Sequence, residues 1–333
     1  MGRNMDKIRF AIIGTGMITE RFLKAAKNCT AFQLTAVYSR DLQKAEHFAL
    51  EHGAEYGCSS LTDLARDKSI DAVYIASPNY MHFSQVLTML QAGKHVLCEK
   101  ALCSNSREAS LLFHTARENH VVLLEAMRLL YDPGYELIRE NIWKLGKLRR
   151  MQLNFCQYSS KYDAFKKGER QNIFDPACSA GALMDIGVYC VHFLIGLFGE
   201  PVSVKASSVM LQGEIDGAGT ILAQYESMQA VLCYSKITAS EANSEIQGED
   251  GTMVFYPVAE PRICEIRYRD GHREVLEISG EENNMIYEIK RFLQGVSSGT
   301  DLNAYQEISR KAIKLMDEIR LQCEIHFPAD DNL

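Results

Sequence analysis

The first 126 residues alternate between short apolar runs and longer stretches with helical spacing, and this alternation constrains the fold more than any other feature. Apolar runs lie at 8–13, 33–38, 71–76, 95–98 and 121–125, and helical patterns lie between them at 17–27, 41–52, 80–91 and 104–119. Continuous apolar strands separated by helices are typical of a parallel sheet that is covered on both faces. Residues 1–126 are therefore predicted to form an α/β, doubly wound Rossmann domain.

The pattern changes after residue 126. Residues 148–158 alternate apolar and polar as a half-buried strand does, and about six further strand-like runs lie between 202 and 278. A polar loop at 159–179 precedes an apolar helix at 181–198, and helices at 282–293 and 304–321 follow. Residues 127–333 are predicted to form an α+β domain with a large, mostly antiparallel open sheet. Because few helices are available to cover that sheet, we expect a homodimer formed through it.

Composition excludes several classes of protein. The net charge of −7 would repel phosphate, so nucleic acid is not an expected partner. No apolar run reaches the ~18–20 residues that a membrane span needs. The ten cysteines show no C-x-x-C pair, and no His/Asp spacing matches a metal site or a metal-dependent hydrolase. The polar start lacks the apolar region of a signal peptide, so we expect a cytoplasmic protein with reduced thiols.

A glycine motif joins the first strand to the first helix. In Gly14-Thr15-Gly16-Met17-Ile18, Gly14 allows a tight turn and Gly16 allows the backbone to approach a pyrophosphate at the helix N-terminus. The third glycine position of this fingerprint holds Thr19. The motif alone is weak, but its place between a strand and a helix, with further βα units after it, predicts a dinucleotide site.

The residues after the second strand indicate which dinucleotide binds. An NAD site would place Asp or Glu about 20 residues after the glycine motif, against the ribose 2′-hydroxyl. This chain has Ser39-Arg40 there, with no acidic group to repel a 2′-phosphate and an arginine that can pair with it. We expect NADP(H) rather than NAD(H), which remains possible; the alternative is that Arg40 is a solvated residue at a turn.

Two further strand ends point to the same edge of the sheet. Ser77 and Pro78 follow the strand at 71–76, and Asn79 is expected to cap the helix that starts at Tyr80. His82 belongs either to the cofactor site or to the surface of that helix.

The strand at 95–98 ends in two opposite charges, Glu99 and Lys100. A partly desolvated lysine in a crevice can exchange protons near neutral pH. The alternative is an ordinary surface ion pair at a strand end.

Polar side chains interrupt the apolar helix at 181–198. Asp185 and Tyr189 are four residues apart, hence on one face, and His192 continues that face. A buried carboxylate needs a cation or a polar ligand, and Lys100 is a candidate partner for Asp185. Tyr189 is predicted to face a substrate, whereas His192 belongs either to the site or to the core.

The ordered set of these motifs resembles the glucose–fructose oxidoreductase/inositol dehydrogenase/MocA-type oxidoreductases over nearly the whole chain. The segments that carry the resemblance are AIIGTG at 11–16, VYSR at 37–40, ASPNYMH at 76–82, AGKHVLCEK at 92–100 and AGALMDIGVY at 180–189. The run from Asp185 to Val191 looks most like the branch of dimeric dihydrodiol dehydrogenase and glucose–fructose oxidoreductase.

The resemblance implies hydride transfer between a nicotinamide and a sugar, polyol or cyclic diol. It implies that Lys100 contacts substrate and nicotinamide, that Asp185 and Tyr189 are the substrate-side polar pair, and that Lys100 or Tyr189 exchanges the hydroxyl proton. Further candidate substrate contacts are Arg128, Arg170 and Asn172.

The chain departs from the family pattern at Ala101, where the family has proline, often after a cis bond. The Lys100–Ala101 bond is therefore expected either to be cis or to be trans with a differently aimed lysine. This departure keeps a second hypothesis open, a catalytically silent NADP(H)-binding sensor of the same fold. The sequence does not specify the substrate or the direction of the reaction.

Overall fold

The structure, a computed structural model, describes residues 7–331. The chain divides into two units by its internal contacts. The first unit contains the residues up to Cys103, Arg107–Ala126 and Glu281–Glu307; the second contains Ser104–Ser106, Met127–Gly280 and the residues from Ile308 onward. The expected division at residue 126 coincides with one of these boundaries, but the chain also returns to the first unit at Glu281.

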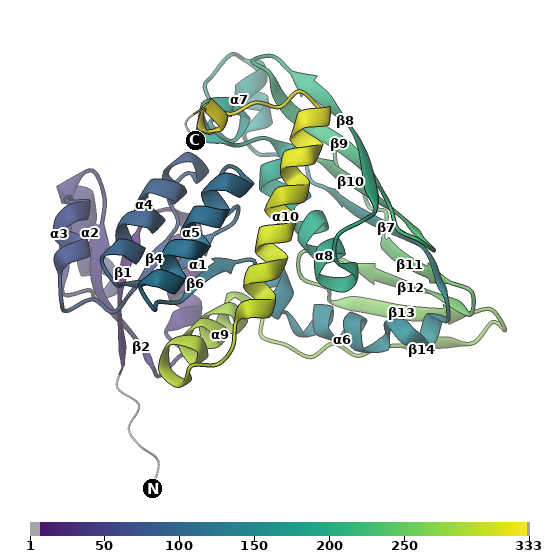
Figure 1. Ribbon diagram of the computed structural model, residues 1–333, viewed down its shortest axis with the longest axis horizontal. Coiled ribbons are helices and arrows are strands. Elements are labelled where there is room, and N and C mark those ends of the chain that lie inside the picture. The colour runs from purple at the N-terminus through teal and green to yellow at the C-terminus, as the bar shows by residue number, and fades with distance from the viewer. Residues whose placement is uncertain (1–6, 332–333) are drawn as a thin grey trace, which may run out of the picture. The chain divides into compact units, whose positions relative to one another are not determined.

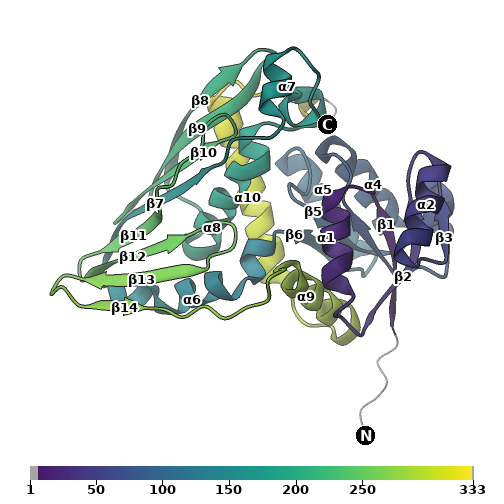
Figure 2. The same ribbon diagram turned by 180° about the vertical axis from the view of Figure 1, so that it is seen from behind.

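The first unit is built on a six-stranded parallel sheet in the order β3-β2-β1-β4-β5-β6. Its strands are β1 (Ile8–Ile13), β2 (Phe32–Tyr38), β3 (Tyr56–Cys58), β4 (Ala72–Ile75), β5 (His95–Glu99) and β6 (Leu123–Ala126). Its helices are α1 (Met17–Ala26), α2 (Leu42–His52), α3 (Leu61–Arg66), α4 (Asn79–Gln91), α5 (Ser106–Glu118) and α9 (Met285–Ser298). Helices α4 and α5 cover the face seen in Figure 1, and α1 covers the face seen in Figure 2. The predicted Rossmann fold is confirmed.

The starts of two helices differ from each other. The Asp41 side chain accepts a hydrogen bond from the Lys44 N–H at 3.2 Å and so caps α2. Helix α5 begins at Ser106, two residues later than the predicted range 104–119, and the Ser104 hydroxyl donates to Ser179 Oγ at 2.7 Å.

Helix α9 completes the core of the first unit. Its Phe292 ring lies 5.8 Å from the ring of Phe10 on β1, and both side chains are fully buried. Just before α9, Asn283 Nδ2 donates to the Arg21 carbonyl oxygen on α1 at 2.7 Å. A helix from the end of the chain therefore covers a face of the N-terminal sheet.

The second unit is built on an eight-stranded sheet in the order β14-β13-β12-β11-β7-β10-β9-β8, in which only the β7–β10 pair is parallel. Its strands are β7 (Leu148–Cys156), β8 (Ser203–Leu211), β9 (Ile215–Gln224), β10 (Gln229–Ser235), β11 (Ser244–Gly248), β12 (Gly251–Tyr256), β13 (Ile263–Tyr268) and β14 (Arg273–Val275). The predicted large, mostly antiparallel sheet is confirmed.

Helices pack on one face of this sheet. They are α6 (Pro133–Asn141), α8 (Val188–Phe198) and most of α10 (Asn303–Gln322), and the short α7 (Tyr162–Lys166) lies in the segment expected to be a loop. Short 3-10 turns are η1 (Arg128–Tyr131), η2 (Ile142–Leu145), η3 (Asn172–Phe174), η4 (Pro176–Cys178) and η6 (Pro328–Asp331). The stretch Pro176–Phe198 is long and apolar enough to cross a membrane, but 78% of its most apolar window is buried in the protein, as in a core helix.

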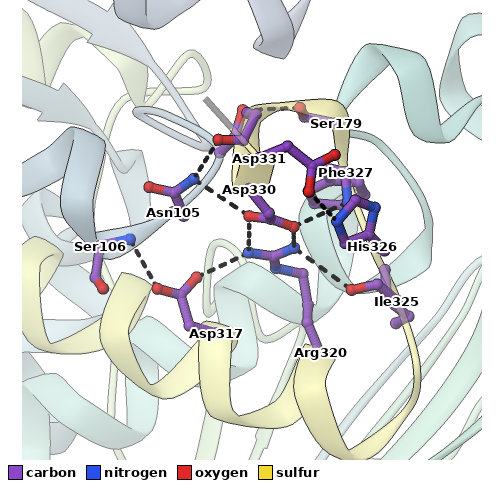
Figure 3. Close-up of polar contacts among 12 residues, drawn as sticks. Asn105, Ser106, Ser179, Asp317, Arg320, Ile325, His326, Phe327, Asp330 and Asp331 are labelled. Carbon is purple, nitrogen blue, oxygen red and sulfur yellow. Dashed lines mark hydrogen bonds and ion pairs between the residues drawn. The ribbon is translucent and has the colours of Figure 1, made fainter. Parts of the chain in front are cut away.

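The C-terminal residues are held by a buried arginine (Figure 3). Arg320 is 4% exposed, pairs with Asp330 at 2.7 Å and with Asp317 at 3.0 Å, and its guanidinium carbon lies 4.4 Å from the Phe327 ring centroid. Asp317 also accepts the Ser106 N–H at 2.8 Å. This network joins η6 to α10 and fixes the segment Ser104–Ser106 in the second unit.

Candidate active site

A cavity of about 270 Å³ opens at the carboxyl ends of β1, β2 and β4 in the first unit. This is the edge at which a Rossmann sheet binds its ligand. Seven predicted cofactor residues line it, namely Gly14, Thr15, Gly16, Ser39, Arg40, Ser77 and Pro78. Ile13, Tyr38, Lys44, Ala76, Met81 and Gln85 complete the lining.

The two motif glycines shape this cavity in different ways. Gly14 has φ +108°, and a Cβ there would lie 2.5 Å from the Ala76 carbonyl oxygen, so no side chain fits between β1 and β4. A Cβ on Gly16 would meet no atom within 4 Å, because this residue faces open space at the start of α1. The backbone at the N-terminus of α1 is therefore accessible to an anionic ligand.

Thr19 takes the third glycine position without disturbing the turn. Its side chain is fully buried, and its hydroxyl donates to the Gly14 carbonyl oxygen at 3.0 Å. The hydroxyl thus satisfies a partly buried backbone acceptor inside the motif.

The end of the cavity beside β2 is basic. Arg40 and Lys44 both line it, and none of the lining residues is acidic. Lys44 was missed by sequence reasoning, although its place in the first turn of α2, four residues after Arg40, was a usable signal. The Lys44 backbone N–H is bound by Asp41, which fixes the start of the helix that carries this lysine.

Other predicted cofactor residues lie outside this cavity lining. Met17 is 83% exposed and Ile18 is 36% exposed at the start of α1. The predicted cap at Asn79 is wrong, because α4 begins at Asn79 itself, after Pro78, and has no side-chain cap. Glu99 is buried and accepts a hydrogen bond from the Tyr74 hydroxyl at 2.6 Å.

His82 is buried and connects two loops, so the alternative of a helix-surface imidazole is wrong. Its Nε2 lies 2.7 Å from the Ser77 carbonyl oxygen and its Nδ1 lies 2.9 Å from the Ala101 carbonyl oxygen. Burial lowers the pKa of His82, against the opposing effect of these two carbonyl groups. The imidazole therefore acts as a bridge between the residues after β4 and those after β5.

Lys100 is half-buried directly after β5. The Lys100–Ala101 peptide bond is cis, which is the first of the two geometries expected at this position. The Leu102 backbone N–H is also fixed, since it donates to the buried Glu125 carboxylate at 3.0 Å.

In the second unit, Asp185 lies on a π-helical turn, η5 (Leu183–Gly187), that runs directly into α8. Such π turns are frequent at functional sites. The cation paired with Asp185 inside this unit is Lys236, whose Nζ lies 2.5 Å from Asp185 Oδ2. Lys236, which follows β10, is 8% exposed and was missed by sequence reasoning. The pairing of Asp185 with the candidate Lys100 stays a prediction.

Tyr189, one turn later, is 7% exposed and lies beside a second ion pair. Arg128 Nε is 3.4 Å from the Tyr189 hydroxyl, and the guanidinium carbon is 5.6 Å from the ring centroid. Arg128 also pairs with Glu260 at 2.5 Å. The predicted substrate residues Arg128 and Tyr189 therefore lie together, and Glu260 joins them.

The remaining predicted substrate residues are placed differently. His192 is fully buried and its Nδ1 lies 2.8 Å from the Val188 carbonyl oxygen in its own helix, an arrangement that favours the core alternative. Arg170 is exposed and pairs with Asp175 at 2.7 Å, and Asn172 is exposed at the start of η3. The substrate roles of Arg170 and Asn172 stay predictions.

Both halves of the chain match known families. Residues 8–127 match the family described as an oxidoreductase family with an NAD-binding Rossmann fold, and residues 136–254 match the Gfo/Idh/MocA C-terminal domain. The chain belongs to the Gfo/Idh/MocA oxidoreductase family. The resemblance seen in the sequence is thereby confirmed.

Several relatives align over nearly the whole chain. Scyllo-inositol 2-dehydrogenase (NADP(+)) IolU of Bacillus subtilis is 44% identical over 326 residues, which cover 97% of this chain and 99% of that protein. Trans-1,2-dihydrobenzene-1,2-diol dehydrogenase of Sus scrofa is 26% identical over 341 residues, which cover 97% of this chain and 99% of that protein. The crystal structure of KijD10, a 3-ketoreductase from Actinomadura kijaniata in complex with NADP and TDP-benzene, matches with a TM-score of 0.86 at 25% identity, covering 96% of this chain and 98% of that one.

Proposed function

We propose that this Gfo/Idh/MocA oxidoreductase uses NADP(H) to transfer a hydride to or from an uncharged polyol or cyclic diol. The observation that carries the proposal is the cavity of the first unit, with a glycine turn at one end and two basic side chains at the other. The NADP dependence named for the Bacillus subtilis relative and the NADP in the KijD10 complex support the same cofactor.

The residues of the cavity fit a dinucleotide phosphate. Gly14 and Gly16 leave room for a pyrophosphate at the start of α1, where backbone N–H groups and the helix dipole favour an anion. Arg40 and Lys44 supply two positive charges for a 2′-phosphate, and no carboxylate in the lining opposes it. When bound, the nicotinamide accepts or donates the hydride.

The side chains of the protein hold the substrate and move its proton. In the oxidation direction, the alcohol loses a hydride from carbon and a proton from oxygen, and Lys100 or Tyr189 takes that proton. Asp185, fixed by Lys236, accepts a hydrogen bond from a substrate hydroxyl. Lys100 additionally contacts the nicotinamide, as in the family pattern.

The charges near Tyr189 favour a neutral substrate. Asp185 is paired with Lys236, and Arg128 is paired with Glu260. Binding a phosphate or carboxylate here would require breaking an existing ion pair, whereas hydroxyl groups can bond to the paired side chains as they stand. We therefore expect inositols and cyclic diols to be better substrates than inositol phosphates or sugar acids.

Absorbance of the reduced nicotinamide tests the proposal directly. Purified protein is mixed with NADP⁺ and a panel of scyllo-inositol, myo-inositol, trans-dihydrodiols, glucose and their phosphorylated or acidic counterparts. Turnover of at least one neutral compound, above every charged counterpart, is expected. Tight NADP(H) binding without hydride transfer to any compound in either direction would favour the catalytically silent sensor instead.

Replacement of Arg40 by Ala is expected to weaken NADP⁺ binding by about 10- to 100-fold and to leave NAD⁺ binding within about twofold, because a charge-assisted hydrogen bond contributes roughly 1.5–3 kcal/mol. Fluorescence titration of the two cofactors measures both changes. Arg66→Ala, at an exposed arginine of the same unit outside the cavity, is the matched control. Equal loss for both cofactors would contradict a 2′-phosphate contact.

We also propose a cytoplasmic homodimer formed through the outer face of the second sheet. Residues that alternate with the buried ones leave apolar side chains on that face, namely Val209 (55% exposed), Leu222 (38%), Ile263 (65%) and Val275 (71%). A monomeric protein rarely exposes a large apolar sheet face.

Leu222→Glu is expected to convert the dimer to a monomer, because it buries a charge in the interface without a partner. Sedimentation velocity at micromolar concentration measures the change. Leu50→Glu, at a leucine that is 82% exposed on α2 in the other unit, should leave the dimer intact. A wild-type protein that sediments only as a monomer would refute the proposed assembly.

A further inference from the structure

One buried carboxylate has no part in the mechanism above. Asp216, on β9, is fully buried, and its Oδ2 accepts the Leu183 N–H at 2.7 Å. Its Oδ1 has no hydrogen-bond partner among residues 7–331. A Cβ on Gly181, which has φ +101°, would lie 2.0 Å from that oxygen, so the carboxylate packs directly against the backbone where the helix begins.

The helix that Asp216 touches is the one that carries Asp185 and Tyr189. The residue directly before η5 is Ala182, which makes no side-chain cap bond. The first N–H groups of a helix need acceptors, and a carboxylate there also interacts favourably with the helix dipole. Asp216 supplies that acceptor from a neighbouring strand, 33 residues along the chain from Leu183.

We propose that Asp216 is a positioning residue, which holds the first turn of this helix, and so fixes Asp185 and Tyr189 for the reaction. The inference rests on the proposed function of those two side chains. It assigns Asp216 no contact with substrate or cofactor. Its effect passes through the Leu183 N–H and the Gly181 backbone.

The charge state of Asp216 provides a test of this role. Burial raises the pKa of Asp216 to about 7, against the lowering effect of the Leu183 N–H. Both forms are therefore populated near neutral pH, and because the pKa is raised in the folded protein, the turn is held less firmly once Asp216 ionises.

Two titratable side chains interact with Asp216, namely Tyr234 on β10 and Cys323 after α10, and burial raises the pKa of both, so both are neutral near pH 7. The charged residues Asp185 and Lys236 are paired with each other, and the Lys236 N–H donates to the carbonyl oxygen of Gly217, next to Asp216, at 2.8 Å. The η3 turn contributes no titratable side chain.

Asp216→Asn tests the proposal with two independent readouts. In the polyol oxidation assay, we expect kcat to fall by about tenfold or more, because small misplacements of reacting groups cost that much, while KM for NADP⁺ stays within about twofold. The ratio of wild-type to variant kcat should fall by about threefold or more between about pH 6 and pH 8, since only the wild type carries a carboxyl group that destabilises this turn as it ionises. A purely structural role would leave that ratio flat and would overturn the proposal.

Hydrogen exchange provides the readout that does not depend on activity. Amides of residues 182–190 should exchange about tenfold faster in Asp216→Asn than in the wild type. Ile221→Val, at another fully buried residue of β9, is the control and should lower Tm without changing that exchange. Unchanged exchange in a folded Asp216→Asn protein overturns the proposal even if no substrate is ever found.

If Asp216→Asn does not fold, the wild type alone decides the question. After correction for intrinsic rates, exchange at 182–190 should be faster at about pH 8 than at about pH 6, because a carboxyl whose pKa is raised in the folded protein stabilises it less once ionised. Exchange that does not change across this range overturns the proposal.

Discussion

Replacement of Lys100 by Met is expected to lower turnover by about three orders of magnitude, within the ~10²–10⁴ range of general acid–base catalysis. Met retains most of the apolar stem and removes only the ammonium group, so the half-buried position after β5 stays filled. NADP⁺ binding should change by less than about threefold, because the proposed phosphate contacts in the cavity do not involve Lys100, which reaches only the nicotinamide. Single-turnover absorbance of the reduced nicotinamide measures the rate, and fluorescence titration measures binding.

Lys94→Met is the matched control at the other end of β5. Lys94 is 7% exposed, and its Nζ donates to the carbonyl oxygens of Asp67 at 2.6 Å and Ile70 at 2.8 Å. Its loss should lower Tm and leave the turnover of the folded protein within about threefold, since its bonds are structural. A wild-type rate in the Lys100 variant would remove this lysine from the mechanism and leave Tyr189 as the proton acceptor.

Replacement of Lys236 by Met is expected to have the second largest effect, on both stability and turnover. Lys236 and Asp185 have side chains that are 10% and 27% exposed, so the variant leaves a mostly buried carboxylate without this cation. We expect a loss of about 2 kcal/mol in the free energy of unfolding, below the ~3–5 kcal/mol of a fully buried pair because Asp185 keeps some solvent. Turnover should fall by about tenfold, because Asp185 is no longer oriented.

A double-mutant cycle with Asp185→Asn separates the pair from its surroundings. The coupling energy, from urea unfolding, should lie within ~0.5–3 kcal/mol. Lys314→Met provides the comparison, since its pair with Glu200 at 3.0 Å has side chains that are 70% and 41% exposed and should contribute at most ~1 kcal/mol. If the changes in the free energy of unfolding at Lys236 and Asp185 were strictly additive, the short contact between them would contribute nothing to stability.

The sequence predicted the Rossmann sheet well because its central strands are buried on both faces and so read as continuous apolar runs. β1 has the predicted bounds, and β5 differs by one residue. Strand β3 has only three residues, all half-buried, and helix α3 has only six residues. Both patterns were too short to be recognised in the sequence. The packing of α9 on the first unit could not be predicted either, because no local pattern shows which sheet a distant amphipathic helix will cover.

The candidate site also contains some residues that the sequence could predict and some that it could not. Gly14, Gly16 and Arg40 follow one strand end or the next, so their common location follows from the topology of a parallel sheet. Lys236 lies 51 residues from its partner Asp185, and spacing alone gave no sign of that pairing. Buried polar residues in strands, such as Asp216, acquire their role only when the register of the second sheet is known.

The path of the chain through the first unit has a consequence for biosynthesis. The hydrophobic surface that α9 covers stays open on the nascent chain after Ala126 has emerged, while roughly 180 further residues are translated. At ~5–20 residues per second, translation of these residues lasts on the order of ten seconds or more, and during that time α9 does not cover the N-terminal sheet. Co-translational maturation of the N-terminal sheet therefore waits for α9 (Met285–Ser298), which is translated after all strands of the second sheet and makes the two units interdependent during folding.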